Sequence, residues 1–345
     1  MKIISTIGFL LLGLSLRAAV LNVSNLPGNG FPYNNVDAAM IAASPGDTIY
    51  VHGSNIQYPD FTITKSIVIL GTGGFTQTEF GLSSRFSRIT FSSNTSNIEI
   101  NGVVLEYYHI DFYALTNIHH VVIKNCYFNQ STYSNIRFSN LSNSSDIRIF
   151  NNVLGGGNSQ KIEFYNNPNC FNIIIDHNII NGSIQNLGII NTIIQNNIFY
   201  NPSSGTAFTG SNSFAIVSNN IFYNCEANAN MTSGIFNNNM TYSSSATLAL
   251  LGGTNFDNVN PQFVNAPASG NYLPSNNFNL QAGSPAIAAG SDGLDLGYYG
   301  GLEAVSPIGE PRNMPVIRKM NIQNPSVPQN GNVNVKVRST KSRTN

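Results

Sequence analysis

The residues best suited to chemistry lie in three short segments that share one pattern. The segments are His109-Ile110-Asp111-Phe112, Asn135-Ile136-Arg137-Phe138 and Lys161-Ile162-Glu163-Phe164. Alternate side chains of a β-strand point to opposite faces, so we expect the Ile and Phe side chains inside and the polar ones outside. Asp111, Arg137 and Glu163 follow one another at intervals of 26 residues. If that interval is one structural repeat, the three charges stack in one column.

Two reactions on polysaccharides can be tested against this column. A β-elimination lyase must neutralise a uronate carboxylate and place a base at the sugar C5. Asp111 and Glu163 could hold Ca²⁺ through their oxygens, and Arg137 or Lys161 could act as base or clamp, although Arg resists deprotonation. A glycosidase needs two carboxylates, but Asp111 and Glu163 would be about 9–10 Å apart, at or beyond the upper limit for an inverting enzyme. Arg137 would also obstruct the water, so the lyase is favoured.

The same column has a purely structural interpretation. An Asp–Arg–Glu ladder on a solvated face would contribute about 0.2–1 kcal/mol per ion pair, and structural ion-pair networks also gather charges. The candidates for substrate binding beside the column are His109, Tyr113, Asn135 and Tyr165. Aromatic rings at these positions would stack on sugars or simply cover the edge of the sheet.

Other polar residues make weaker candidates. His119-His120 has no third metal ligand at a convincing spacing. His120 is expected beside Asp146 across one repeat, on a solvated surface. Asp176 and His177 are adjacent, but strand alternation predicts that they point to different sides and do not work as a pair. The three cysteines have no CxxC spacing, which argues against a zinc site, and Cys126 is interpreted as a packing residue.

A recurring sequence motif sets the register of the repeats. Each copy has a short aliphatic strand, a polar corner with Asn and a second short apolar strand; the copies lie at residues 121–128, 147–154, 173–180, 192–199 and 215–222. The corner residues are Cys126, Asn152, Asn178, Asn197 and Asn220, with Asn238 next along the chain. Strand-only repeats of about 20–26 residues predict a β-helix. The corner Asn residues are expected to form a buried amide ladder, which is structural rather than ligand-binding.

These features resemble the right-handed parallel β-helix proteins of the pectate-lyase-like superfamily over residues 33–301. Residues 44–51, reading SPGDTIYV, resemble the start of such helices, and residues 260–264, 283–287 and 295–297 resemble their end. The resemblance implies an all-β right-handed solenoid in which the corner Asn lies between the second and third strands of each coil. It also implies that the outer face of the following first strand lines a substrate cleft. It does not specify an activity, because this fold carries many activities; no contiguous pectate-lyase signature and no polygalacturonase-type acidic cluster is present.

The ends of the chain differ from its middle. Residues 1–19 have the basic start, apolar run and small-residue end of a secretory signal peptide. Residues 20–47 are predicted as a linker and N-terminal cap containing a short helix at 36–43, and residues 48–301 as the β-helix. The Pro-interrupted segment 302–345 is predicted to be an appendage with one strand near 332–337 and a disordered basic tail.

Composition and these signals set the expected function. Only 9% of the 345 residues are charged and the formal net charge is zero, which argues against nucleic acid or an anionic membrane as the partner. No segment after the signal peptide is apolar enough to span a membrane. The sequence therefore predicts a secreted or cell-surface β-helix protein whose partner is a polysaccharide. The enzyme hypothesis is a lyase of acidic glycans, the alternative is a noncatalytic glycan-binding protein, and nothing in the sequence indicates an oligomeric state.

Overall fold

The structure is a computed structural model, and it describes most of the chain. The described residues are 18–28, 30–73, 82–131, 133–156, 160–200, 205–210, 214–227, 231, 233–243, 254–266, 272–273, 275–303, 315–322 and 335–341. The predicted signal peptide at residues 1–19 lies almost wholly outside them. Within the described part of the chain, no helix is long and apolar enough to cross a membrane.

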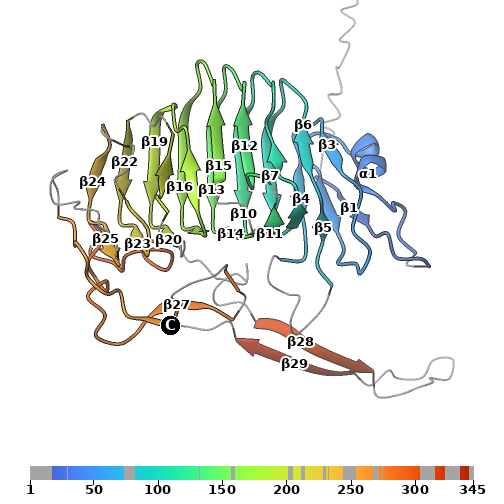
Figure 1. The fold of residues 1–345 in the computed structure, drawn as a ribbon. Helices are drawn as coiled ribbons and strands as arrows, with labels where there is room; N and C mark the ends of the chain where they lie inside the picture. The colour runs from blue at the N-terminus through green and yellow to red at the C-terminus, as the bar shows by residue number, and fades with distance from the viewer. Residues whose placement is uncertain are drawn as a thin grey trace, which may run out of the picture.

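Three parallel sheets form the body of the molecule (Figure 1). Sheet A contains, in spatial order, β1 (Val20–Val23), β2 (Thr48–Val51), β4 (Val68–Leu70), β7 (Ser96–Asn101), β10 (His119–Lys124), β13 (Ser145–Phe150), β16 (Phe171–Asp176), β19 (Ile190–Gln195), β22 (Ala215–Ser218) and β24 (Ile235–Asn237). Sheet B contains β5 (Arg85–Phe86), β8 (Val104–Tyr107), β11 (Tyr127–Ser131), β14 (Val153–Leu154), β17 (Ile179–Ile180), β20 (Ile198–Tyr200), β23 (Ile221–Tyr223) and β25 (Met240–Tyr242). Sheet C contains β3 (Phe61–Ile63), β6 (Ile89–Phe91), β9 (Ile110–Asp111), β12 (Ile136–Ser139), β15 (Gln160–Tyr165), β18 (Ser183–Gln185) and β21 (Phe208–Thr209).

From β4 to β23 the chain visits the sheets in the repeating order A, B, C, and each strand pairs in parallel with its equivalent on the next coil. The fold is therefore the right-handed parallel β-helix that the sequence predicts. Aliphatic side chains fill its interior because every second residue of a strand points inward. On sheet C the interior also holds a stack of phenylalanine rings with centroids 4.3, 4.7 and 4.9 Å apart, formed by Phe91, Phe112, Phe138 and Phe164.

The predicted amide ladder is present at the corner between sheets A and B. Asn178 is fully buried; its Nδ2 donates to the Ile149 carbonyl at 2.8 Å and to Asn197 Oδ1 at 3.0 Å, and its Oδ1 accepts from the Asn152 backbone N–H at 2.9 Å. The same bonds recur through Asn220 and Asn239. The prediction of Asn238 was wrong by one residue. Asn238 has φ of 54° and occupies the left-handed turn position before the ladder residue, where Asn is also favoured.

The N-terminal end is closed by the helix α1 (Val36–Ala42), whose Val36, Ala39 and Met40 are buried. Asn35 caps its first turn, and the Lys65 ammonium donates to the carbonyls of Met40, Ile41 and Ala43 at its last turn. Sheet A nevertheless begins before residue 48, because β1 pairs with β2 and so contributes a strand from the segment predicted as linker and cap.

The coils end earlier than the predicted boundary at residue 301. After β25, residues 256–299 pack against the outer face of sheet B and form a second hydrophobic cluster with it. This segment contains the antiparallel pair β26 (Phe263–Asn265) and β27 (Asn277–Leu280), so it wraps the solenoid instead of extending it. In the appendage, β28 (Pro315–Ile322) pairs antiparallel with β29 (Val335–Lys341), which places part of the predicted disordered tail in a strand.

Candidate functional site

The charged column forms on the outer face of sheet C as the spacing predicts. Arg137 on β12 is in register with Asp111 on β9 and with Glu163 on β15. Ile110, Ile136 and Ile162 precede these residues and are fully buried inside, so strand alternation directs the three charged side chains outward. Among described residues, Thr90, Gln185 and Thr209 continue the column on the neighbouring coils.

Arg137 is paired with Asp111 through two hydrogen bonds. Its Nε donates to Oδ1 at 3.0 Å and its Nη2 to Oδ2 at 2.7 Å. His109 Nε2 lies 3.2 Å from the same Oδ2. Burial alone would raise the pKa of the Asp111 carboxyl, but the bonds from His109 and Arg137 outweigh it and hold that pKa below its usual value.

Glu163 stands apart from this pair. Its Oε2 accepts a hydrogen bond from the Ser134 hydroxyl at 2.9 Å, and the guanidinium of Arg137 turns toward Asp111 instead. The Arg137 guanidinium also lies over the ring of Tyr113, 5.1 Å from its centroid. The expected Asp–Arg–Glu ladder is therefore asymmetric, with one tight pair and one carboxylate bound to a hydroxyl.

A second column beside the first is buried, although it faces outward. It contains His109, Asn135 and Lys161, which precede the inward Ile residues and are 4%, 0% and 0% exposed. The sequence places these residues on an accessible surface, but the structure buries all three side chains. Lys161 Nζ donates to the carbonyls of Gly155 and Gly156 at 3.1 and 3.0 Å. Burial lowers the pKa of the Lys161 ammonium to about 7.

Two members of the buried column keep unused hydrogen-bonding atoms. Neither the nitrogen nor the oxygen of the Asn135 amide, nor Nδ1 of His109, has a hydrogen-bond partner among the residues that the structure describes. Buried polar groups are almost always paired, so each such atom marks a place that needs an explanation.

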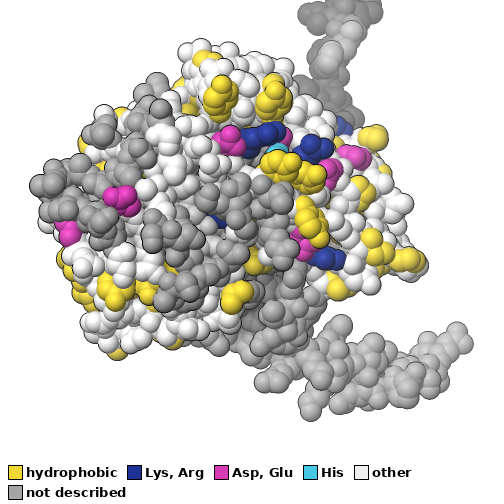
Figure 2. Space-filling model, viewed as in Figure 1, with side chains coloured by type: hydrophobic (Ala, Val, Ile, Leu, Met, Phe, Trp, Pro, Cys, Tyr) yellow, Lys and Arg dark blue, Asp and Glu magenta, His cyan; other side chains and the backbone are white. Residues whose placement is uncertain are grey.

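Half-exposed tyrosines flank both columns. Tyr113 lies two residues beyond the end of β9 and Tyr165 is the last residue of β15. They are 54% and 58% exposed. Tyr108 and Tyr133 precede the buried column; their rings are stacked with centroids 5.4 Å apart and an interplanar angle of 14°. Figure 2 shows charged side chains and a histidine gathered in one strip over β12 and its neighbours, with hydrophobic-class side chains, tyrosines included, beside the strip.

The predicted calcium ligands fit Ca²⁺ poorly in this arrangement. Ca²⁺ takes six to eight oxygen ligands, whereas both oxygens of Asp111 already accept bonds from Arg137, whose positive charge lies between Asp111 and Glu163. No group of three or more His, Cys, Asp or Glu side chains suited to a metal occurs within the described part of the chain. The calcium site therefore stays a prediction.

The weaker candidates lie on sheet A as expected. His120 Nδ1 lies 3.7 Å from Asp146 Oδ2, and His120 is well exposed. His119 Nδ1 lies 3.0 Å from the Ser145 hydroxyl. Lys124 is in register with Phe150 and pairs with Glu99 at 2.9 Å. The three cysteines are buried and free, which agrees with the interpretation of Cys126 as a packing residue.

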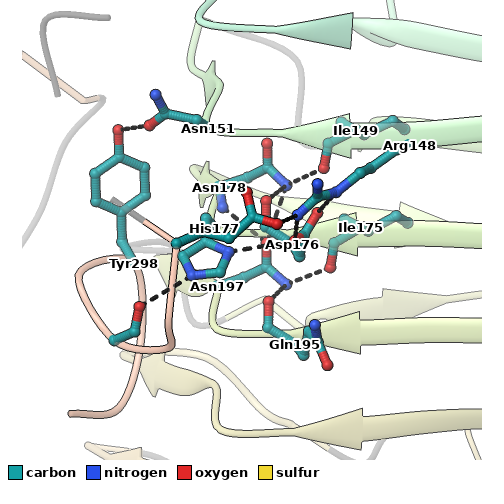
Figure 3. Close-up of polar contacts among 12 residues, drawn as sticks. Arg148, Ile149, Asn151, Ile175, Asp176, His177, Asn178, Gln195, Asn197 and Tyr298 are labelled. Carbon is teal, nitrogen blue, oxygen red and sulfur yellow. Dashed lines mark hydrogen bonds and ion pairs between the residues drawn. The ribbon is translucent and has the colours of Figure 1, made fainter. Parts of the chain in front are cut away.

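The expectation that Asp176 and His177 do not meet is wrong. His177 Nδ1 lies 3.3 Å from Asp176 Oδ2 (Figure 3), because His177 occupies the left-handed corner position, with φ of 53°, and its ring turns back. His177 Nε2 lies 3.0 Å from the carbonyl of Gly300. Arg148 binds Asp176 on one side and Glu303 at 2.7 Å on the other. The network fastens the segment around Gly300 and Glu303 to sheet A. In the sequence, the one indication of this network is Asp176, an acidic residue at the end of a repeat strand.

Comparisons with known proteins identify no family for this chain. No protein-family model matches the sequence, and no curated protein matches it. Solved structures that match include ORF18 of Geobacillus virus E2, at 15% identity and a TM-score of 0.32, covering 65% of this chain and 52% of that one. PfbA, a surface adhesin of Streptococcus pneumoniae, matches at 13% identity and a TM-score of 0.31, covering 62% of this chain and 66% of that one. The PL6 family alginate lyase AlyGC matches at 11% identity and a TM-score of 0.32, covering 86% of this chain and 60% of that one.

Proposed function

We propose that this protein is a secreted or cell-surface β-helix protein that binds a polysaccharide along the outer face of sheet C. The observation that carries the proposal is the set of half-exposed tyrosines on both sides of the polar columns, Tyr108 and Tyr133 on one side and Tyr113 and Tyr165 on the other. Ligand sites combine aromatic surface with a few placed polar groups, and a Tyr ring offers both an apolar face and a hydroxyl. A sugar chain has matching apolar faces and hydroxyl edges.

Binding without catalysis is the form that the geometry supports best. A catalytic carboxylate needs an oxygen free to act, whereas both oxygens of Asp111 are engaged by Arg137 and one also by His109. Glu163 is bound by Ser134 through Oε2 only, so the column offers at most one available carboxylate, whereas glycoside hydrolysis needs two. The column thus supports the face structurally and lends it local charge.

Lyase action is the second candidate, and one observation favours it. A base that removes the C5 proton works best with a pKa near the operating pH, and burial lowers the pKa of Lys161 to about 7. Lys161 is bound to the Gly155 and Gly156 carbonyls and is fully buried, so it would act only after these two hydrogen bonds open. Arg137 would then be the clamp on the uronate carboxylate.

The binding proposal is tested by affinity electrophoresis through gels that contain one polysaccharide each, neutral or acidic. We expect at least one polysaccharide to retard the protein, and Tyr113→Ala combined with Tyr165→Ala to weaken that retardation at least tenfold. Phe171→Ala is the matched control, because Phe171 is also an exposed aromatic residue but lies on sheet A. Retardation that is unaffected by the tyrosine changes would overturn the assignment to this face.

The lyase candidate is tested by absorbance at 235 nm with acidic polysaccharides, with and without added Ca²⁺. A new unsaturated product that disappears in Lys161→Met would establish it. If no unsaturated product forms across a broad panel, the lyase candidate is rejected and binding is the only function that remains.

A further inference from the structure

The buried amide of Asn135 is the least explained polar group on the proposed binding face. Asn135 is fully buried, and both its side-chain nitrogen and its oxygen lack partners among the described residues. Asn178 is equally buried, but its nitrogen donates to three acceptors and its oxygen accepts from Asn152. Burying an amide without partners destabilises a fold. Asn135 is therefore a poor choice for stability alone, and Leu would fit a position of this size.

The neighbouring imidazole of His109 has a defined polarity. Both carboxylate oxygens of Asp111 accept hydrogen bonds from the Arg137 guanidinium, so this carboxylate acts only as an acceptor. His109 Nε2, 3.2 Å from Asp111 Oδ2, must then carry the proton. In the neutral imidazole the remaining nitrogen, Nδ1, is an acceptor, and it has no partner among the described residues.

His109 and Asn135 are neighbours on adjacent coils. Ile110 pairs with Ile136 in register, and the Ile110 N–H donates to the Asn135 carbonyl at 3.0 Å, so the two polar residues occupy equivalent positions one coil apart. Equivalent residues on adjacent strands are about 4.8 Å apart. A single small polar group lying between them can therefore reach both side chains.

We propose that His109 and Asn135 form a subsite that binds a hydroxyl group of the polysaccharide. The sugar hydroxyl donates its proton to His109 Nδ1 and accepts a hydrogen bond from the Asn135 Nδ2–H. A hydroxyl suits this position because it can donate one hydrogen bond and accept another at the same time. This inference rests on the proposed binding function and deepens it by naming the chemical group that this position binds.

The stacked tyrosines cover this subsite. The Tyr133 ring lies edge-on to the His109 ring, with centroids 5.8 Å apart, and the Tyr108 ring is similarly placed at 6.3 Å. Both tyrosines are about half exposed, so each ring is reached by solvent as well as by the histidine. A sugar reaches the subsite by displacing one ring of the pair and taking its place against the other.

The test measures stability and binding in the same variant. In Asn135→Leu, which keeps the branching and the number of heavy atoms of the side chain and removes both polar atoms, we expect Tm to rise by about 2–4 °C. We also expect affinity for the polysaccharide that retards the wild type to fall at least tenfold. Asn178→Leu is the matched control: the same exchange at a paired amide lowers Tm. Asn135→Ala, which cannot overpack, repeats the binding measurement should the Leu variant fold poorly.

The outcomes separate this inference from the binding proposal. Binding by Asn135→Leu or Asn135→Ala that equals the wild type overturns the subsite while leaving the polysaccharide face intact, and it assigns the unpaired atoms to a buried water. A fall in Tm together with the loss of binding also overturns it, because Asn135 is then structural. Wild-type protein that no neutral or acidic polysaccharide retards overturns both proposals.

Discussion

Arg137 and Asp111 lie on adjacent coils of sheet C and form a two-point ion pair, with Nε–Oδ1 and Nη2–Oδ2 distances of 3.0 and 2.7 Å. The pair is one-sided: Asp111 is buried, whereas the Arg137 side chain is 30% exposed. Removal of the arginine therefore leaves a buried carboxylate with only His109 beside it. Such an uncompensated charge destabilises more than the loss of an exposed pair.

Arg137→Met should lower the free energy of unfolding by about 1–3 kcal/mol at pH 7. The pKa of Asp111 is depressed in the folded protein, so the stability that this pair adds is fully present above the ordinary carboxyl pKa of about 3.9 and is lost as pH falls through the folded-state value. The difference between variant and wild type should thus shrink below pH 4. Urea unfolding at pH 7 and pH 3.5 measures it, with Glu163→Gln, which removes a carboxylate held by one hydroxyl, as the milder control. A difference that stays constant with pH would refute the assignment to Asp111.

Lys161 should make stability rise with pH in the neutral to alkaline range. Burial lowers its folded-state pKa to about 7 from its ordinary value of 10.5. Between these values the unfolded chain binds a proton that the folded chain does not, so the free energy of unfolding increases with pH by up to about 1.4 kcal/mol per unit. The increase should be absent in Lys161→Met and retained in Lys124→Met, which removes an ion-paired lysine on sheet A. Urea unfolding at pH 6.5, 8 and 9.5 measures the slopes, and equal slopes in all three proteins would contradict the prediction.

The repeat predicts the interior well because its rules are local. Inward aliphatic residues and the corner amides recur at a regular spacing. In a parallel ladder, residues separated by one repeat occupy equivalent positions on adjacent coils. For the same reason the spacing of 26 residues is enough to place Asp111, Arg137 and Glu163 in one column.

The burial of Lys161, Asn135 and His109 could not be read from the sequence, because it depends on contacts made outside the strands. Examples are the bonds from Lys161 to the Gly155 and Gly156 carbonyls and the contact of His109 with the Tyr133 ring. The contact between His177 and Gly300 joins residues 123 positions apart and depends on the path of the C-terminal segment. Alternation correctly describes residues inside a strand, but His177 stands just after β16 with a positive φ, where alternation stops.

The first member of the amide ladder offers a stabilising change. Cys126 occupies the ladder position, and its thiol lies 3.1 Å from the Lys124 carbonyl and 3.9 Å from the Ile100 carbonyl. These correspond to the carbonyls that Asn178 Nδ2 reaches at Asp176 and Ile149. Cys126→Asn should therefore extend the ladder by one coil and raise the free energy of unfolding by about 0.5–1.5 kcal/mol.

Asn178→Ala should lower the free energy of unfolding by about 2–4 kcal/mol, because it leaves buried polar groups on both neighbouring coils without partners. Thermal unfolding compares the two, and a destabilised Cys126→Asn would show that the thiol packs better than an amide there.

The C-terminal segment should be an integral part of the fold rather than a removable appendage. Phe278 on β27 is 1% exposed and packs against Tyr200 of sheet B, with ring centroids 5.7 Å apart, and against Phe263 and Tyr272. Phe278→Ala should therefore cost about 3–5 kcal/mol. Tyr165→Ala, at a ring that is 58% exposed on sheet C, should change stability by no more than about 0.5 kcal/mol.

Because coils of a solenoid can unfold in steps, guanidinium unfolding should be paired with limited proteolysis. We expect Phe278→Ala to open cleavage sites within residues 254–303 before the coils are cut. Simultaneous cleavage of the segment and the coils would mean that the two unfold as one unit, and an unchanged pattern would mean that the segment does not pack on sheet B.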